Sequence, residues 1–167
     1  MQATVRLELR SADGSVGEVR RARNSVMKGG AELIAKLFAG TASSGITHMG
    51  IGTNGSPQQP DFSTLKLDVN VDSPEDIKGG SETPIAPADI KVAIDETRRM
   101  VVVKLHATLP KEVGIGTIRE AGLLSKSGED TLVLYNRVTF APIAKSGEHE
   151  LTMFWEVTFP YGDLNWM

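Results

Sequence analysis

The chain has 167 residues, a formal net charge of −3 and no cysteine. This length is typical of a single domain and is enough to bury a hydrophobic core. The absence of cysteine excludes disulfides, thiolate zinc sites and cysteine nucleophiles. Because its net charge is negative, the chain as a whole has no strong electrostatic attraction for nucleic acid or anionic membranes. No apolar run approaches the roughly 20 residues of a membrane span, and the N-terminus lacks the apolar core of a signal peptide, so we expect a soluble protein.

The charges are unevenly distributed along the chain. Residues 1–36 hold seven basic side chains against four acidic ones, whereas residues 61–96 hold nine acidic side chains against three lysines. This asymmetry is compatible with head-to-tail contacts between copies of the chain, in which a basic surface meets an acidic one. It is also compatible with two charged surfaces that face only solvent, and the sequence alone leaves both interpretations open.

The first 40 residues predict a hairpin followed by a short helix. Residues 3–10 alternate apolar and polar side chains, an Asp-Gly pair at Asp13 and Gly14 signals a tight turn, and residues 16–23 return as a second strand. The apolar spacing then becomes helical. Because Gly29 and Gly30 weaken the first turn, we expect the helix to begin only at about Ala31, with Gly40 at the position of its C-terminal cap.

The rest of the chain predicts short strands separated by turns. Seven further segments are predicted as strands: 46–53, 65–71, 90–94, 100–109, 117–126, 131–140 and 150–159, and the last has the clearest alternation. Residues 73–89 are polar and rich in proline and glycine, which predicts a long surface loop or arm. The whole pattern predicts one mainly β domain, residues 1–167, with about nine strands and one short helix in an antiparallel β-sandwich or jelly-roll-like fold.

Motifs that could carry chemistry are weak. Residues 50–55 read Gly-Ile-Gly-Thr-Asn-Gly and match a nucleotide-binding pattern in letters, but prolines follow where a helix N-terminus is needed. Asp68, Asn70 and Asp72 have calcium-loop spacing, but the glycine and the glutamate that should follow are missing. The three histidines are far apart in the sequence and have no second ligand at metal spacing. We therefore expect no cofactor, no metal site and no enzymatic activity.

Two groups of residues are candidates for contact with a partner. Arg20, Arg21 and Arg23 form a basic cluster, whose alternative role is to keep a strand edge soluble. The last 14 residues hold five of the nine aromatic side chains, and the tail 161–167 continues past the final strand. Exposed aromatic residues often anchor interfaces, although such a tail can also fold back on its own domain. The predicted interface residues are Arg20, Arg21, Arg23, Phe154, Tyr161, Trp166 and Met167.

Four segments together resemble small structural proteins of tailed bacteriophages and related phage-like particles. In chain order they are a Gly-x-Gly-Thr turn at 50–53, a Glu-Ala-Gly-Leu strand at 120–123, an Asn-Arg strand at 136–137 and a Trp-Glu-Val-x-Phe strand at 155–159. The resemblance spans about residues 30–160 and keeps the order of the elements. It implies a non-enzymatic virion component of the tail, neck, baseplate or fibre attachment, assembled in several copies inside the bacterial host cytoplasm.

The expected partners are therefore further copies of this chain and other tail, neck or baseplate proteins, and neither nucleic acid nor a membrane. The alternative is a lectin-like module of the same particle that binds a host surface glycan through loops such as 54–60.

Overall fold

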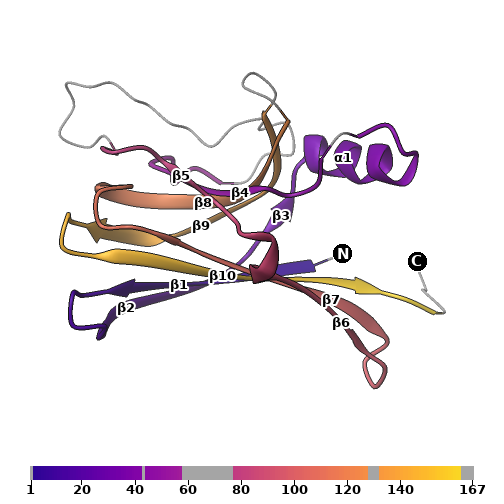
Figure 1. The fold of residues 1–167 in the computed structure, drawn as a ribbon, viewed down its shortest axis with the longest axis horizontal. Coiled ribbons are helices and arrows are strands. Elements are labelled where there is room, and N and C mark those ends of the chain that lie inside the picture. Colours follow the sequence, from indigo (N-terminus) through magenta and orange to yellow (C-terminus); the bar gives the residue numbers. More distant parts are fainter. Residues whose placement is uncertain (1, 43, 58–76, 128–131, 163–167) are drawn as a thin grey trace.

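The described strands form two facing antiparallel sheets (Figure 1). The computed structural model describes residues 2–42, 44–57, 77–127 and 132–162. Sheet A has the strand order β2-β1-β10-β7-β6, and sheet B has the order β3-β9-β8-β4-β5. The predicted β-sandwich is confirmed, with ten strands in the described ranges where about nine are expected in the whole chain. The elements are β1 (Gln2–Arg10), β2 (Val16–Arg23), β3 (Ser25–Val26), α1 (Lys28–Phe38), β4 (His48–Gly52), β5 (Glu82–Pro84), a 3-10 turn (Pro87–Asp89), β6 (Ile90–Asp95), β7 (Met100–Leu109), β8 (Gly116–Lys126), β9 (Leu132–Lys145) and β10 (Glu150–Pro160).

The core forms where the alternating apolar rows of the two sheets meet. The N-terminal strand β1 lies beside β10 with Leu7 opposite Met153 and Val5 opposite Trp155. All four side chains are buried, and Trp155 is 1% exposed. Because side chains alternate between the two faces of a strand, the intervening polar residues of β1 and β10 lie on the outer face of sheet A. The alternation of apolar and polar residues along β1 and β10 therefore determines which side chains enter the core and which face outward.

Helix α1 begins at Lys28, three residues before the predicted start. A Cβ atom on Gly30 would lie 2.1 Å from the carbonyl oxygen of Tyr135 on β9, so this glycine allows the helix and the strand to approach closely. The helix does end as predicted. Gly40 has a φ of +70°, and its N–H donates a hydrogen bond of 3.2 Å to the carbonyl of Leu37.

The predicted loop or arm at 73–89 is described from Ile77 onward, and this part is more regular than expected. Glu82–Pro84 forms the edge strand β5, which pairs with β4, and Pro87–Asp89 forms the 3-10 turn that leads into β6. Pro84 is accommodated because β5 is the outermost strand of sheet B. The predicted strand at 65–71 lies outside the described residues. Among the helices that the structure describes, none is long and apolar enough to cross a membrane.

Candidate functional site

A buried ion pair joins two of the motifs that carry the family resemblance. Glu120 on β8 and Arg137 on β9 pair through Oε2 and Nε, and neither side chain is exposed to solvent. The guanidinium also donates hydrogen bonds to the carbonyl oxygens of Asn54 (2.7 Å) and Ser56 (3.0 Å). The backbone N–H of Asn54 donates to Oε1 of Glu120 at 3.3 Å. A buried charge pair is stable only when its remaining hydrogen-bonding capacity is also satisfied, and the loop after β4 supplies those partners here.

The glycine-rich motif at 50–55 is therefore a structural junction. Gly52 ends β4, and a Cβ atom at this position would lie 2.2 Å from Oε1 of Glu120. The loop carbonyls that follow are occupied by Arg137. The motif is thus a strand end that turns into a loop.

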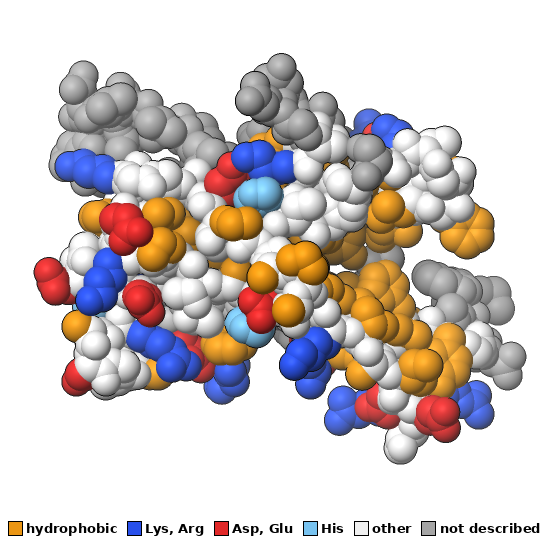
Figure 2. Space-filling view, in the orientation of Figure 1, with side chains coloured by type: hydrophobic (Ala, Val, Ile, Leu, Met, Phe, Trp, Pro, Cys, Tyr) orange, Lys and Arg blue, Asp and Glu red, His pale blue; other side chains and the backbone are white. Residues whose placement is uncertain are grey.

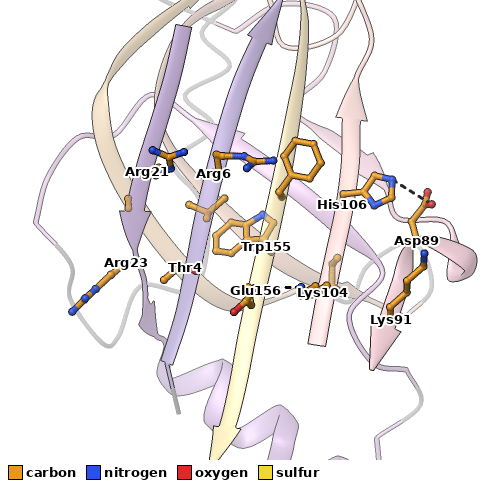
Figure 3. A pocket seen from close by; sticks show the side chains of 14 residues that line it. Thr4, Arg6, Arg21, Arg23, Asp89, Lys91, Lys104, His106, Trp155 and Glu156 are labelled. Atoms are coloured by element: carbon orange, nitrogen blue, oxygen red, sulfur yellow. Dashed lines mark ion pairs between the residues drawn. The ribbon is translucent and has the colours of Figure 1, made fainter. Parts of the chain in front are cut away.

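A broad hollow lies on the outer face of sheet A (Figure 3), and we call it the basic hollow. Its volume is about 830 Å³. Its ionisable lining comprises five cationic side chains, two carboxylates and one histidine: Arg6, Arg21, Arg23, Lys91 and Lys104; Asp89 and Glu156; and His106. The hollow is thus positive on a chain whose overall charge is negative.

Strand register orders the centre of the basic hollow. Arg6 lies opposite Arg21 on one side and opposite Phe154 on the other, and Phe154 lies opposite His106. The guanidinium carbon of Arg6 is 4.5 Å from the centre of the Phe154 ring, and the His106 ring stacks on the same side chain at 6.0 Å. Nε2 of His106 is 3.4 Å from Asp89. The aromatic ring is therefore flanked by side chains of both neighbouring strands.

Three of the predicted interface residues come together in this hollow: Arg21, Arg23 and Phe154. Arg20 does not join them, because alternation turns it towards sheet B. Its guanidinium donates hydrogen bonds of 3.1 Å to the carbonyls of Ala141 and Pro142 on β9. This arginine connects the two sheets.

The other three predicted interface residues belong to the C-terminal tail. Tyr161 follows β10 and is 40% exposed. Trp166 and Met167 lie outside the described residues, so their predicted role stays a prediction.

A second surface feature is an apolar cleft of about 360 Å³ between α1 and the inner face of sheet A. Its lining includes Leu37 of α1, Val103 of β7 and Phe159 of β10. The inner face continues past the cleft onto β6, where Val92 and Ile94 are 67% and 66% exposed. Figure 2 shows the corresponding apolar surface on the side of the molecule where the β6–β7 hairpin extends beyond sheet B.

The described ranges contain no group of three histidine or acidic side chains that could hold a metal ion. The calcium-like spacing at Asp68, Asn70 and Asp72 lies outside those ranges. His48 is partly buried, and this desolvation lowers its pKa. Its Nδ1 lies 2.8 Å from the hydroxyl of Thr47, which is a local contact.

Sequence reasoning missed several residues that the structure brings into these sites. Arg6 and His106 were on the outer row of alternating strands, but only the pairing of β1, β10 and β7 places them around Phe154. The sequence resemblance marks Glu120 and Arg137 only as strand positions. Each lies inside an otherwise apolar strand, and this position indicates a buried ion pair, because a charged side chain is rarely buried without a partner.

Comparison with protein-family models, curated proteins and solved structures gives no match to this chain.

Proposed function

We propose that this chain is a non-enzymatic structural protein of a tailed phage or a phage-like particle, which is assembled in the bacterial host cytoplasm and is present in the virion in several copies. The ordered set of four sequence motifs supports this proposal. Three of the motifs fall on β4, β8 and β9, which are adjacent in sheet B, and the fourth falls on β10. The Glu120–Arg137 pair holds the first three together, so the shared residues build a scaffold.

The observation that carries the assembly role is the uncovered apolar face of β6. Val92 and Ile94 lie on the same side of sheet A as the buried core, yet about two thirds of each is exposed. Contiguous apolar surface of this kind favours association in water. The apolar cleft beside it extends the same surface towards α1.

The occupant we propose for this face is a second copy of the chain. In the described residues β6 is an edge strand of sheet A and pairs only with β7. Such an edge strand can pair with itself, antiparallel, across a two-fold axis, and the pairing joins the two apolar rows. Lys91 and Asp95 lie at opposite ends of β6 on the other face, so the same antiparallel arrangement brings opposite charges towards each other.

Sedimentation analysis over the micromolar range tests this interface. Wild-type protein should form dimers or larger assemblies, and the variant Val92→Ser/Ile94→Ser should shift towards monomer. The matched control is Val16→Ser/Val19→Ser, which changes two exposed valines of similar size on β2. A wild-type protein that stays monomeric, or an equal shift in the control, would contradict the second-copy interface.

Mass spectrometry of purified particles tests the virion role itself. The chain should be present at a stoichiometry of several copies per particle. Intact particles that lack the chain would overturn the assignment to the virion, whatever the oligomeric state of the isolated protein.

A further inference from the structure

The edge strand β2 combines a backbone edge with no second strand beside it, where the Val19 carbonyl accepts a hydrogen bond from Arg20, with an ordered row of cations. In the part of the chain that the structure describes, β2 pairs only with β1 and ends the strand order of sheet A. Its outer row consists of Val19, Arg21 and Arg23, because these residues lie opposite the outward-facing Glu8, Arg6 and Thr4 of β1. All three side chains of the row are exposed.

The two arginines of this row have no acidic partner among the described residues, and neither has Lys91 across the hollow. Other cations of the hollow are engaged: Arg6 lies 3.1 Å from Glu8, and Lys104 lies 4.0 Å from Glu156. The side chains left over are therefore all positive. They line one concave surface, which strengthens their combined potential.

The spacing of Arg21 and Arg23 matches an extended polypeptide. They are two residues apart on one face of a strand, which corresponds to about 6.7 Å. A strand added beside β2 presents its alternate side chains at the same spacing. Carboxylates at two alternate positions could then each meet one guanidinium, whose planar donors suit a carboxylate.

We propose that β2 is the docking site for an acidic, extended segment of a partner protein, which adds to sheet A as a further strand. Main-chain hydrogen bonds to the free edge supply part of the affinity, and the pairs with Arg21 and Arg23 select acidic side chains at alternate positions. Val19 offers an apolar contact two residues further along the row. This inference rests on the proposed function, since it names the chemistry of one partner in an assembled particle.

The details of the hollow favour a polypeptide over nucleic acid. Binding of single-stranded nucleic acid uses open aromatic faces for base stacking, and here Arg6 and His106 flank the one aromatic ring on the outer surface of the hollow, that of Phe154. Asp89 and Glu156 also lie in the hollow and repel a continuous phosphate backbone. A strand edge, in contrast, is a direct template for another chain.

Fluorescence anisotropy with a synthetic probe tests the inference. The probe is an eight-residue peptide of alternating glutamate and valine with a fluorescein label, and its control carries glutamine in place of glutamate. Arg21→Gln/Arg23→Gln should weaken binding of the acidic peptide by about tenfold. The matched control Lys36→Gln/Arg98→Gln removes the same charge from exposed cations outside the hollow and should leave binding within about twofold of wild type.

Amide hydrogen exchange locates the bound peptide. Added acidic peptide should slow exchange within 16–23, because new main-chain hydrogen bonds form along β2. The inference is overturned by absent binding, by an equal loss in the two double variants, by binding without protection of β2, or by equally tight binding of an oligothymidine. None of these results bears on the presence of the chain in particles or on dimerisation through β6, so the failure of this inference is distinguishable from failure of the proposed function.

Discussion

Arg137 and Glu120 form a fully buried ion pair between β9 and β8, and the arginine holds the loop carbonyls of Asn54 and Ser56 at 2.7 and 3.0 Å. One charged side chain thus connects two central strands of sheet B to the loop that follows β4. This contact explains why a strand of the core contains an arginine at all. It also explains the neighbouring glycine, since a larger residue at Gly52 would occupy the space of the carboxylate.

Removing one partner of this pair should destabilise the fold strongly. Arg137→Met leaves the Glu120 carboxylate buried without its cation, and we expect the free energy of unfolding to fall by about 3–5 kcal/mol. Chemical denaturation measures the change. Lys126→Met is the control, because its pair with Glu82 is partly exposed and should contribute no more than about 1 kcal/mol.

The double variant Glu120→Leu/Arg137→Met sharpens this prediction. It removes both charges, so it should be less destabilised than Arg137→Met alone. If the free energy of unfolding falls by a similarly small amount in Arg137→Met and Lys126→Met, the prediction that the buried pair contributes more than the exposed one is wrong.

Two adjacent glycines of α1 should respond in opposite ways to alanine. At Gly29 the new Cβ would lie 3.5 Å from Val133, an ordinary contact, and the higher helix propensity of alanine should stabilise the fold by up to about 1 kcal/mol. At Gly30 the Cβ would lie 2.1 Å from the backbone oxygen of Tyr135, so Gly30→Ala should cost about 1–3 kcal/mol or more. Thermal unfolding of the two variants gives the comparison, and equal effects would contradict the close approach of α1 to β9.

Stability should fall at high pH through Tyr135. Burial raises the pKa of this phenol from 10.0 to about 12, so the folded state favours its neutral form. The resulting stabilisation is complete below pH 10 and is lost as the pH rises from about 10 to about 12. Its upper limit is roughly 2–3 kcal/mol for a shift of this size.

Denaturation curves collected across this pH range test the tyrosine assignment. The free energy of unfolding of Tyr135→Phe should fall less steeply with rising pH than that of wild type. A change in stability that is the same at every pH does not affect this comparison of slopes. Parallel declines in the two proteins would assign the alkaline transition to other groups.

Deletion of 161–167 tests the predicted docking of the C-terminal tail on a neighbour. If Tyr161, Trp166 and Met167 anchor that contact, the truncated protein should form smaller assemblies, as measured by light scattering. The substitution Tyr161→Ser is the milder companion, because it removes one exposed aromatic and keeps the length of the chain. An unchanged assembly mass after the deletion would remove the tail from the interface.

The β1–β2 hairpin and the inward faces of the longer strands could be predicted from the local sequence pattern. Period-two alternation identifies which side chains of β1 and β10 enter the core, and the turn at Asp13 and Gly14 closes the β1–β2 hairpin. The short strands β3 and β5 escaped this reasoning because two or three residues carry no measurable period. Helix propensity alone predicts too late a start for α1, because the close packing of Gly30 against β9 outweighs the low helix propensity of glycine.

The sequence by itself determined the alternating rows, and with them the β-sandwich class and the division of side chains between core and surface, because this information is local and repeats every two residues. Only the tertiary structure decided which strands are neighbours. It placed β1 beside β10 from the opposite end of the chain, brought Glu120 to Arg137, and set Arg20 against the carbonyls of β9. Strand pairing depends on contacts between distant segments, and the local pattern of a strand is compatible with many partners.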